Sequence, residues 1–153
     1  MNYGFKLEDV ARVETISPEF WVKVLERTKV TPLTTTNKYW GQEMLLYKAH
    51  AGSVLKRIDM NAGSQSSMEY HCYKQETYYV AYGELKVGVR VGRAENHAIT
   101  VLAGEMLRIP PGLMHMRMAI TDVVIIEWAS ADDPRDTHIV HDGQTYRFEE
   151  GPQ

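Results

Sequence analysis

Four side chains that suit a divalent metal ion stand in two short stretches of this sequence. Glu69 and His71 are two residues apart on a segment with strand character, so both side chains leave the same face. Glu76 follows five residues after His71, and His115 comes just after a Pro-Pro-Gly turn. Two carboxylates and two imidazoles offer mixed oxygen and nitrogen donors, which suit zinc, manganese, iron, nickel or cobalt. The sequence therefore predicts a metal site formed by these four residues.

The elements that must position these residues are short strands separated by glycine or polar breaks. No alternation of strands and helices competes with this pattern, and many short strands with regular turn signals favour a sandwich or barrel. We therefore expect an all-β fold, a double-stranded jelly-roll barrel with a short N-terminal helix. The expected strands cover residues 42–48, 53–60, 66–72, 76–82, 84–91, 97–102, 106–109, 113–119 and 122–130.

The residues before the barrel predict a separate arm. Ser17-Pro18-Glu19 has the residue types of a helix start, and apolar residues recur at helical spacing over residues 18–28. Residues 31–37 are polar and contain proline, which favours a linker. We expect an N-terminal arm and helix over residues 1–36 and the barrel over 37–153. The polar segment after Ser130 is expected to close over one end of the barrel.

Strand parity places Glu69, His71 and His115 on the inward side of the barrel. Burying carboxylates without a partner is costly, and a divalent cation resolves this by neutralising them and keeping both histidines unprotonated. Four protein ligands leave one or two positions open for water or substrate. The alternative is a hydrogen-bonded Glu/His cluster that holds no metal.

Three further residues are candidates for contact with a substrate. Arg117 is the next inward residue after His115, where a guanidinium would suit a carboxylate or phosphate, or would form a salt bridge at the barrel mouth. Glu127 interrupts an apolar strand, which favours a proton acceptor or a hydrogen-bond partner of the metal site. Tyr78, two residues beyond Glu76, either lines the pocket or belongs to the core.

Length and composition set limits on the class of protein. At 153 residues with 44% apolar residues, the chain suffices for one domain with one core. A net charge of −3 with both signs interspersed does not suggest a nucleic-acid or membrane surface. One cysteine, Cys72, cannot form an internal disulfide; we expect a packed thiol and a cytoplasmic protein. His50, His97 and His138 are expected on the surface.

The spacing of the predicted ligands resembles that of the cupin superfamily. The order Gly63, Glu69, His71, Glu76, Gly83 is similar to the first cupin motif, with Glu69 in place of its first histidine. Gly104, Pro110, Gly112 and His115 are similar to the second motif, and Ala119 stands where that motif usually ends in asparagine. The resemblance implies the jelly-roll barrel and the metal site described above.

A narrower resemblance covers roughly residues 37–147 and points to the cupin domain of type II mannose-6-phosphate isomerases. The segments Lys38–Glu43, Lys56–Ile58 and Ser67–His71 are similar to that family's motifs. Glu69 stands where the family has glutamine, and His141 stands where it usually has arginine. Through this resemblance Lys56 is a candidate for holding a substrate oxygen or exchanging a proton, and its alternative is an ordinary solvated lysine.

The resemblance implies an isomerase that interconverts an aldose and a ketose, acting on a sugar or sugar phosphate. The metal would polarise the substrate carbonyl and stabilise an enediolate, while Glu127 or Lys56 moves a proton. An iron-dependent cupin dioxygenase and a non-catalytic small-molecule-binding cupin are the alternatives. A homodimer is the expected assembly.

Overall fold

The computed structural model describes residues 17–19, 22 and 31–151. The arm expected over residues 1–16 and most of the helix expected over 18–28 lie outside these residues. The unit that begins at Pro32 is the barrel. Its first strand, β1 (Thr34–Lys38), spans the expected boundary between residues 36 and 37. The expectation of a linker over 31–37 was therefore wrong for residues 34–37, because this polar stretch pairs with the next strand.

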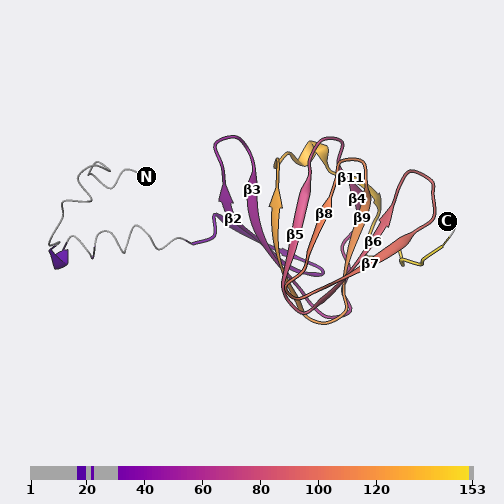
Figure 1. The fold of residues 1–153 in the computed structure, drawn as a ribbon, viewed down its shortest axis with the longest axis horizontal. Coiled ribbons are helices and arrows are strands. Elements are labelled where there is room, and N and C mark those ends of the chain that lie inside the picture. The colour runs from indigo at the N-terminus through magenta and orange to yellow at the C-terminus, as the bar shows by residue number, and fades with distance from the viewer. Residues whose placement is uncertain (1–16, 20–21, 23–30, 152–153) are drawn as a thin grey trace. The chain divides into compact units, whose positions relative to one another are not determined.

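The described part of the barrel unit is built from short strands, and Figure 1 shows them as two groups that face each other. No helix among the described residues is long and apolar enough to cross a membrane. The strands after β1 are β2 (Gly41–Lys48), β3 (Val54–Met60), β4 (Met68–Tyr70), β5 (Glu76–Tyr82), β6 (Glu84–Arg90), β7 (His97–Leu102), β8 (Met106–Ile109), β9 (Met114–Ala119), β10 (Val123–Ala129) and β11 (His138–His141), with a 3-10 turn, η1 (Pro134–Asp136), before β11.

The strands form two antiparallel sheets. One sheet has the order β1-β2-β3-β10-β5-β8 and the other has the order β11-β4-β9-β6-β7. Consecutive strands in the chain cross between the two sheets at several points, as in a jelly roll. The all-β fold and the nine expected strands are confirmed, and the ends of eight of them shift by at most one residue. The exception is β4, which covers only three residues because the chain bends away after Tyr70.

The core lies between the sheets and follows the two-residue period of the strands. In β10, Val123, Ile125, Glu127 and Ala129 are buried, and the residues between them are more exposed. Since alternate side chains leave opposite faces, this strand directs Glu127 into the interior together with its apolar neighbours. The apolar residues of the main cluster are Trp40, Ile58, Met60, Tyr78, Val80, Leu85, Val87, Val101, Ile109, Ala119, Val123 and Ile125.

The segment after Ser130 lies over one end of the barrel, as expected, but it is more ordered than a polar loop. It forms η1 and then β11, which pairs with β4. Asp133 caps η1 by accepting a hydrogen bond from the Arg135 N–H. Further on, the Phe148 ring lies directly against Gly88, where even a Cβ would collide with it. The end of the described chain is thereby held against the five-stranded sheet.

Candidate metal centre

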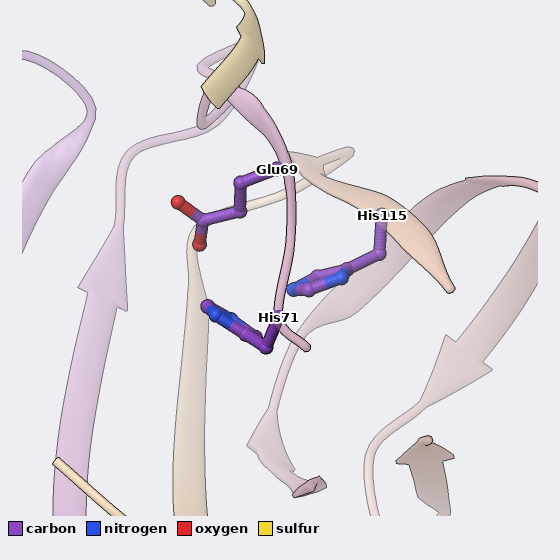
Figure 2. A group of neighbouring side chains, drawn as sticks. All are labelled: Glu69, His71 and His115. Atoms are coloured by element: carbon purple, nitrogen blue, oxygen red, sulfur yellow. The ribbon is translucent and has the colours of Figure 1, made fainter. Parts of the chain in front are cut away.

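Three of the predicted ligands come from two neighbouring strands of the five-stranded sheet and the first residue after one of them. Glu69 in β4 pairs directly with His115 in β9, and His71 follows one residue after β4 ends. Figure 2 shows the Glu69 carboxylate and both imidazole rings turned toward one another. One donor atom from each residue lies within 4.8 Å of the others. The two-residue spacing and the cross-strand pair together produce this convergence.

The fourth predicted ligand, Glu76, approaches from the opposite sheet. It is the first residue of β5 and is 2% exposed. Its Oε1 lies 3.3 Å from His71 Nε2, and its Oε2 lies 3.2 Å from His115 Nε2. The cluster therefore lies between the two sheets, with Glu76 facing both imidazoles.

Backbone carbonyls fix the orientation of both histidines. His71 Nδ1 lies 2.9 Å from the Asp136 carbonyl oxygen, and His115 Nδ1 lies 3.0 Å from that of Leu113. Because a carbonyl oxygen can only accept, Nδ1 must carry the proton in each ring. In the neutral imidazoles, Nε2 then holds the lone pair and faces the cluster. This arrangement is typical of histidines that bind metal ions.

These donors fit a divalent metal ion. Both Nε2 atoms are buried without a hydrogen-bond partner, even though a Glu76 oxygen is close to each. A lone pair that faces a carboxylate is unfavourable unless a proton or a cation lies between them. Two donors that are each about 2.1 Å from one ion at right angles are about 3 Å apart, close to the observed separations.

Lys74 and Tyr78 hold the Glu76 carboxylate from the other side. Lys74 Nζ lies 2.5 Å from Oε1, and the Tyr78 hydroxyl donates to Oε2 at 2.6 Å. Without a metal, burial favours the neutral acid, but hydrogen bonds and positive charge from His115 and His71 when they carry a second proton, together with Lys74, outweigh it and lower the pKa of Glu76 well below its usual value; a bound cation would take the place of those imidazole protons. Glu76 is therefore an anion, as a metal ligand must be.

The prediction that Tyr78 binds substrate does not fit its position. The side chain is 0% exposed, belongs to the main apolar cluster and does not line the cavity described below. Burial and the negative charge of Glu76 raise the pKa of the Tyr78 phenol well above its usual value. Tyr78 remains a neutral donor that orients Glu76.

A cavity of about 410 Å³ opens beside the cluster. Its wall includes Glu69 and Glu76, and the segment after Ser130 forms part of its rim. Most of the side chains that line it are polar or charged. They are Lys38, Tyr39, Trp40, Glu43, Lys56, Ser66, Ser67, Glu69, Lys74, Glu76, Arg117, Glu127, Asp132, Asp133, Pro134, Thr137 and Ile139.

Arg117 and Glu127 form a buried pair in the cavity wall. Arg117 Nη1 donates to Glu127 Oε2 at 3.2 Å, and Nη2 lies 3.9 Å from a Glu69 oxygen. Burial, followed by the negative charge of Glu76, raises the pKa of the Glu127 carboxyl to about 7, against the opposing charges of Arg117 and Lys56. Glu127 therefore has the proton affinity of an acid–base catalyst near neutral pH.

Lys56 also lines the cavity but is engaged by acids. Its Nζ lies 3.3 Å from Glu43 and 3.4 Å from Asp132. Burial opposes its charge, yet the carboxylates of Glu127, Glu43 and Asp132 outweigh this and raise the pKa of Lys56. Lys56 stays protonated, so the proposed role as a base does not fit, whereas a role as a donor to a substrate oxygen does.

The sequence analysis missed two residues that support the site. Lys74 is one, although its place two residues before Glu76 was a usable signal. Asp136 is another: its carboxylate accepts from the backbone N–H groups of Cys72 and Lys74, at 2.8 and 2.9 Å. Cys72 is exposed rather than packed, because the chain has left the strand before this residue.

A family model described as cupin matches residues 29–146. No curated protein sequence matches the chain.

Among solved structures, the capsular polysaccharide assembling protein CapF from Staphylococcus aureus matches with a TM-score of 0.66 and 23% identity, over 73% of this chain and 33% of CapF. KdgF from Halomonas sp. matches with a TM-score of 0.57 and 15% identity, over 67% and 89%. Oxalate oxidase in complex with the substrate analogue glycolate matches with a TM-score of 0.51 and 27% identity, over 58% and 46%. The matched region thus spans about a third of the CapF chain.

Proposed function

The chain belongs to the cupin family, and we propose that it is a metal-dependent isomerase that interconverts an aldose and a ketose. The observation that carries this proposal is the position of Glu127. This carboxyl, with a pKa raised to about 7, lines the same cavity as Glu69 and Glu76. Aldose–ketose interconversion needs one group that takes a proton from one carbon and returns it to the next, and such a group works best with a pKa near the working pH.

The four predicted ligands, Glu69, His71, Glu76 and His115, would hold the metal. When bound, the metal would polarise the substrate carbonyl and offset negative charge on its oxygens. Glu127 would move the proton between the two carbons of the substrate. Arg117 orients the Glu127 carboxylate through the 3.2 Å contact. Lys56, which stays protonated, would donate a hydrogen bond to a substrate oxygen.

The charges of the cavity favour an unphosphorylated sugar. Apart from the exposed Lys38, each cation of the wall already has an acidic partner: Lys56 has Glu43 and Asp132, Lys74 has Glu76, and Arg117 has Glu127. A phosphate would have to displace these carboxylates and would meet their negative charge. Sugar hydroxyls, in contrast, can both donate to carboxylates and accept from ammonium and guanidinium groups. We therefore expect a free sugar to be preferred to its phosphate.

Hydrogen exchange at C2 in heavy water tests this proposal. The protein, reconstituted separately with Mn²⁺, Zn²⁺, Fe²⁺, Co²⁺ and Ni²⁺, is incubated with free aldoses and ketoses and with their phosphates. We expect deuterium at C2 of at least one free sugar, no incorporation after removal of the metal, and weaker incorporation into the matching phosphate. Lack of exchange in every sugar with every metal would refute the isomerase.

A second candidate function is an iron-dependent dioxygenase. Glu69, His71 and His115 offer two imidazoles and one carboxylate, the donor set that suits non-haem iron with open positions. Oxygen consumption by the Fe²⁺-loaded protein, with no C2 exchange, would favour this candidate over the isomerase.

A further inference from the structure

A second group of metal-binding donor types lies beside the candidate centre. It consists of Cys72, Asp136 and His138, and one donor atom from each lies within 4.8 Å of the others. Cys72 Sγ is 3.4 Å from His138 Nε2. Cys72 belongs to the loop between β4 and β5, while the other two residues belong to η1 and β11. None of the three is a predicted ligand of the first site.

The three donors are held in place by contacts that do not depend on a metal. Asp136 accepts the Cys72 N–H at Oδ1, and its Oδ2 accepts from Tyr73 and Lys74. The His138 ring stacks on Tyr70, with ring centres 4.9 Å apart and planes 21° apart. The loop, the carboxylate and the imidazole are thus oriented before any ion binds.

Asp136 has capacity left for an additional partner. A carboxylate oxygen has two lone pairs, and Oδ1 accepts one described hydrogen bond. The loop N–H groups hold the Asp136 carboxylate beside the Cys72–His138 pair. A cation bound by the thiolate and the imidazole could therefore also take the remaining lone pair of Oδ1.

The donor chemistry selects the class of ion. In a tetrahedral zinc site, sulfur lies about 2.3 Å and nitrogen about 2.0 Å from the metal, which places the two about 3.5 Å apart. The observed 3.4 Å agrees with this separation. A thiolate favours zinc and softer ions over magnesium, calcium or manganese. Two anionic ligands would balance a divalent charge, and the exposed position of Cys72 leaves room for water as the fourth ligand.

We propose that Cys72, Asp136 and His138 form a second metal site, specific for zinc and other thiophilic divalent cations. The ion binds to the thiolate, and the thiol proton is released to solvent. The site is separate from the proposed catalytic centre, whose ligands include no sulfur.

Titration with Cd²⁺ tests this proposal on the protein as purified. Thiolate coordination to Cd²⁺ gives an intense near-ultraviolet charge-transfer band, and Cys72 is the single cysteine of the chain. The band therefore reports on this site alone, whatever occupies the first one. We expect saturation at one Cd²⁺ per chain and complete loss of the band in Cys72→Ser.

Variants of the other two proposed ligands distinguish a site formed by three residues from binding to the Cys72 thiol alone. His138→Ala and Asp136→Asn should each weaken Cd²⁺ binding by at least about tenfold, since even loss of an outer-shell partner costs a metal site about 10- to 100-fold. His97→Ala, which removes an exposed histidine elsewhere, should change nothing. Circular dichroism and thermal unfolding verify that each variant is folded.

Two results would overturn the proposal. If the folded His138→Ala protein binds Cd²⁺ as tightly as the parent, the ion is held by a lone thiol. If the band saturates at half an equivalent, two chains share one ion. The outcome is independent of C2 exchange, so failure of either proposal leaves the other standing.

Discussion

His71 and His115 are set up as ligands by groups outside the cluster. Backbone carbonyls of Asp136 and Leu113 fix the Nδ1 proton, so each Nε2 is left with a lone pair directed at Glu76. Replacing both imidazoles by methyl groups removes two of the four predicted ligands. We therefore expect His71→Ala with His115→Ala to lose bound metal, as measured by elemental analysis of the purified protein.

Glu69 should matter less than the histidines. It is the most exposed of the four residues, with 18% of its side chain accessible, and its replacement by glutamine keeps one oxygen donor. Glu69→Gln should therefore retain partial metal occupancy. His97→Ala is the control for both experiments. If the double histidine variant holds metal as tightly as the parent, the ligand assignment is wrong.

Glu127 is predicted to set the pH dependence of catalysis. Its folded pKa is raised to about 7, and a base must be ionised to accept a proton. Because a bound metal offsets the Glu76 charge that helps to raise this pKa, activity should fall as pH decreases through a value at or below about 7 and level off above it. Glu127→Gln should lower the rate of C2 exchange by about 10²- to 10⁴-fold and leave metal content unchanged, with the exposed Glu95→Gln as control. An unchanged pH profile in Glu127→Gln would exclude Glu127 as the base.

Among the elements, the 3-10 turn η1 links the segment after Ser130 to the candidate metal centre. Asp136 holds the loop 72–74 through its carboxylate and His71 through its carbonyl oxygen. This single turn therefore positions His71 and, through the loop, Lys74 beside Glu76. A 3-10 turn with such contacts acts as part of the site's outer shell.

We expect Asp136→Ala to weaken metal binding at the first site by about 10- to 100-fold, because the loop loses its three N–H contacts. Asp136→Asn keeps one acceptor oxygen and should lose less. Isothermal titration with Mn²⁺, which a thiolate site disfavours, reports on the first site without interference from Cys72. If Asp136→Ala and the parent bind Mn²⁺ with equal affinity, η1 does not support metal binding at the first site.

For the whole molecule, the metal is expected to tie the two sheets together. Glu76 belongs to one sheet, while the other three predicted ligands come from the other sheet or the loop that follows β4. An ion that binds the folded chain at 100 times its Kd adds about 2.7 kcal/mol of stability. For a domain of this size that amounts to roughly 5 to 10 °C in Tm.

Removal of the metal with a chelator should therefore lower Tm by about this amount, and returning the metal should restore it. Differential scanning calorimetry measures both steps. The double histidine variant provides the control, since its Tm should not respond to the chelator. A parent Tm that is the same with and without metal would contradict a bridging ion.

The homodimer expected from the sequence remains a prediction at this scale. Light scattering coupled to size-exclusion chromatography should give twice the chain mass of 17.5 kDa. A single-chain mass over a wide range of concentration would contradict it.

The sequence by itself determined nine of the eleven strands in the described residues, the inward parity and the cupin family. Each of these depends on local periodicity and spacing, as in β10, where alternation alone placed Glu127 inside. The sequence also named Glu69, His71, Glu76 and His115, although their role as ligands stays a prediction.

Only the tertiary structure decided how distant segments meet. The pairing of Thr34–Lys38 with β2, the buried position of Tyr78, the acidic partners of Lys56 and the contact of Asp136 with His71 all join residues whose relation no local pattern contains. The proton affinity of Glu127 belongs to the same group, because burial and neighbouring charges exist only once the chain has folded.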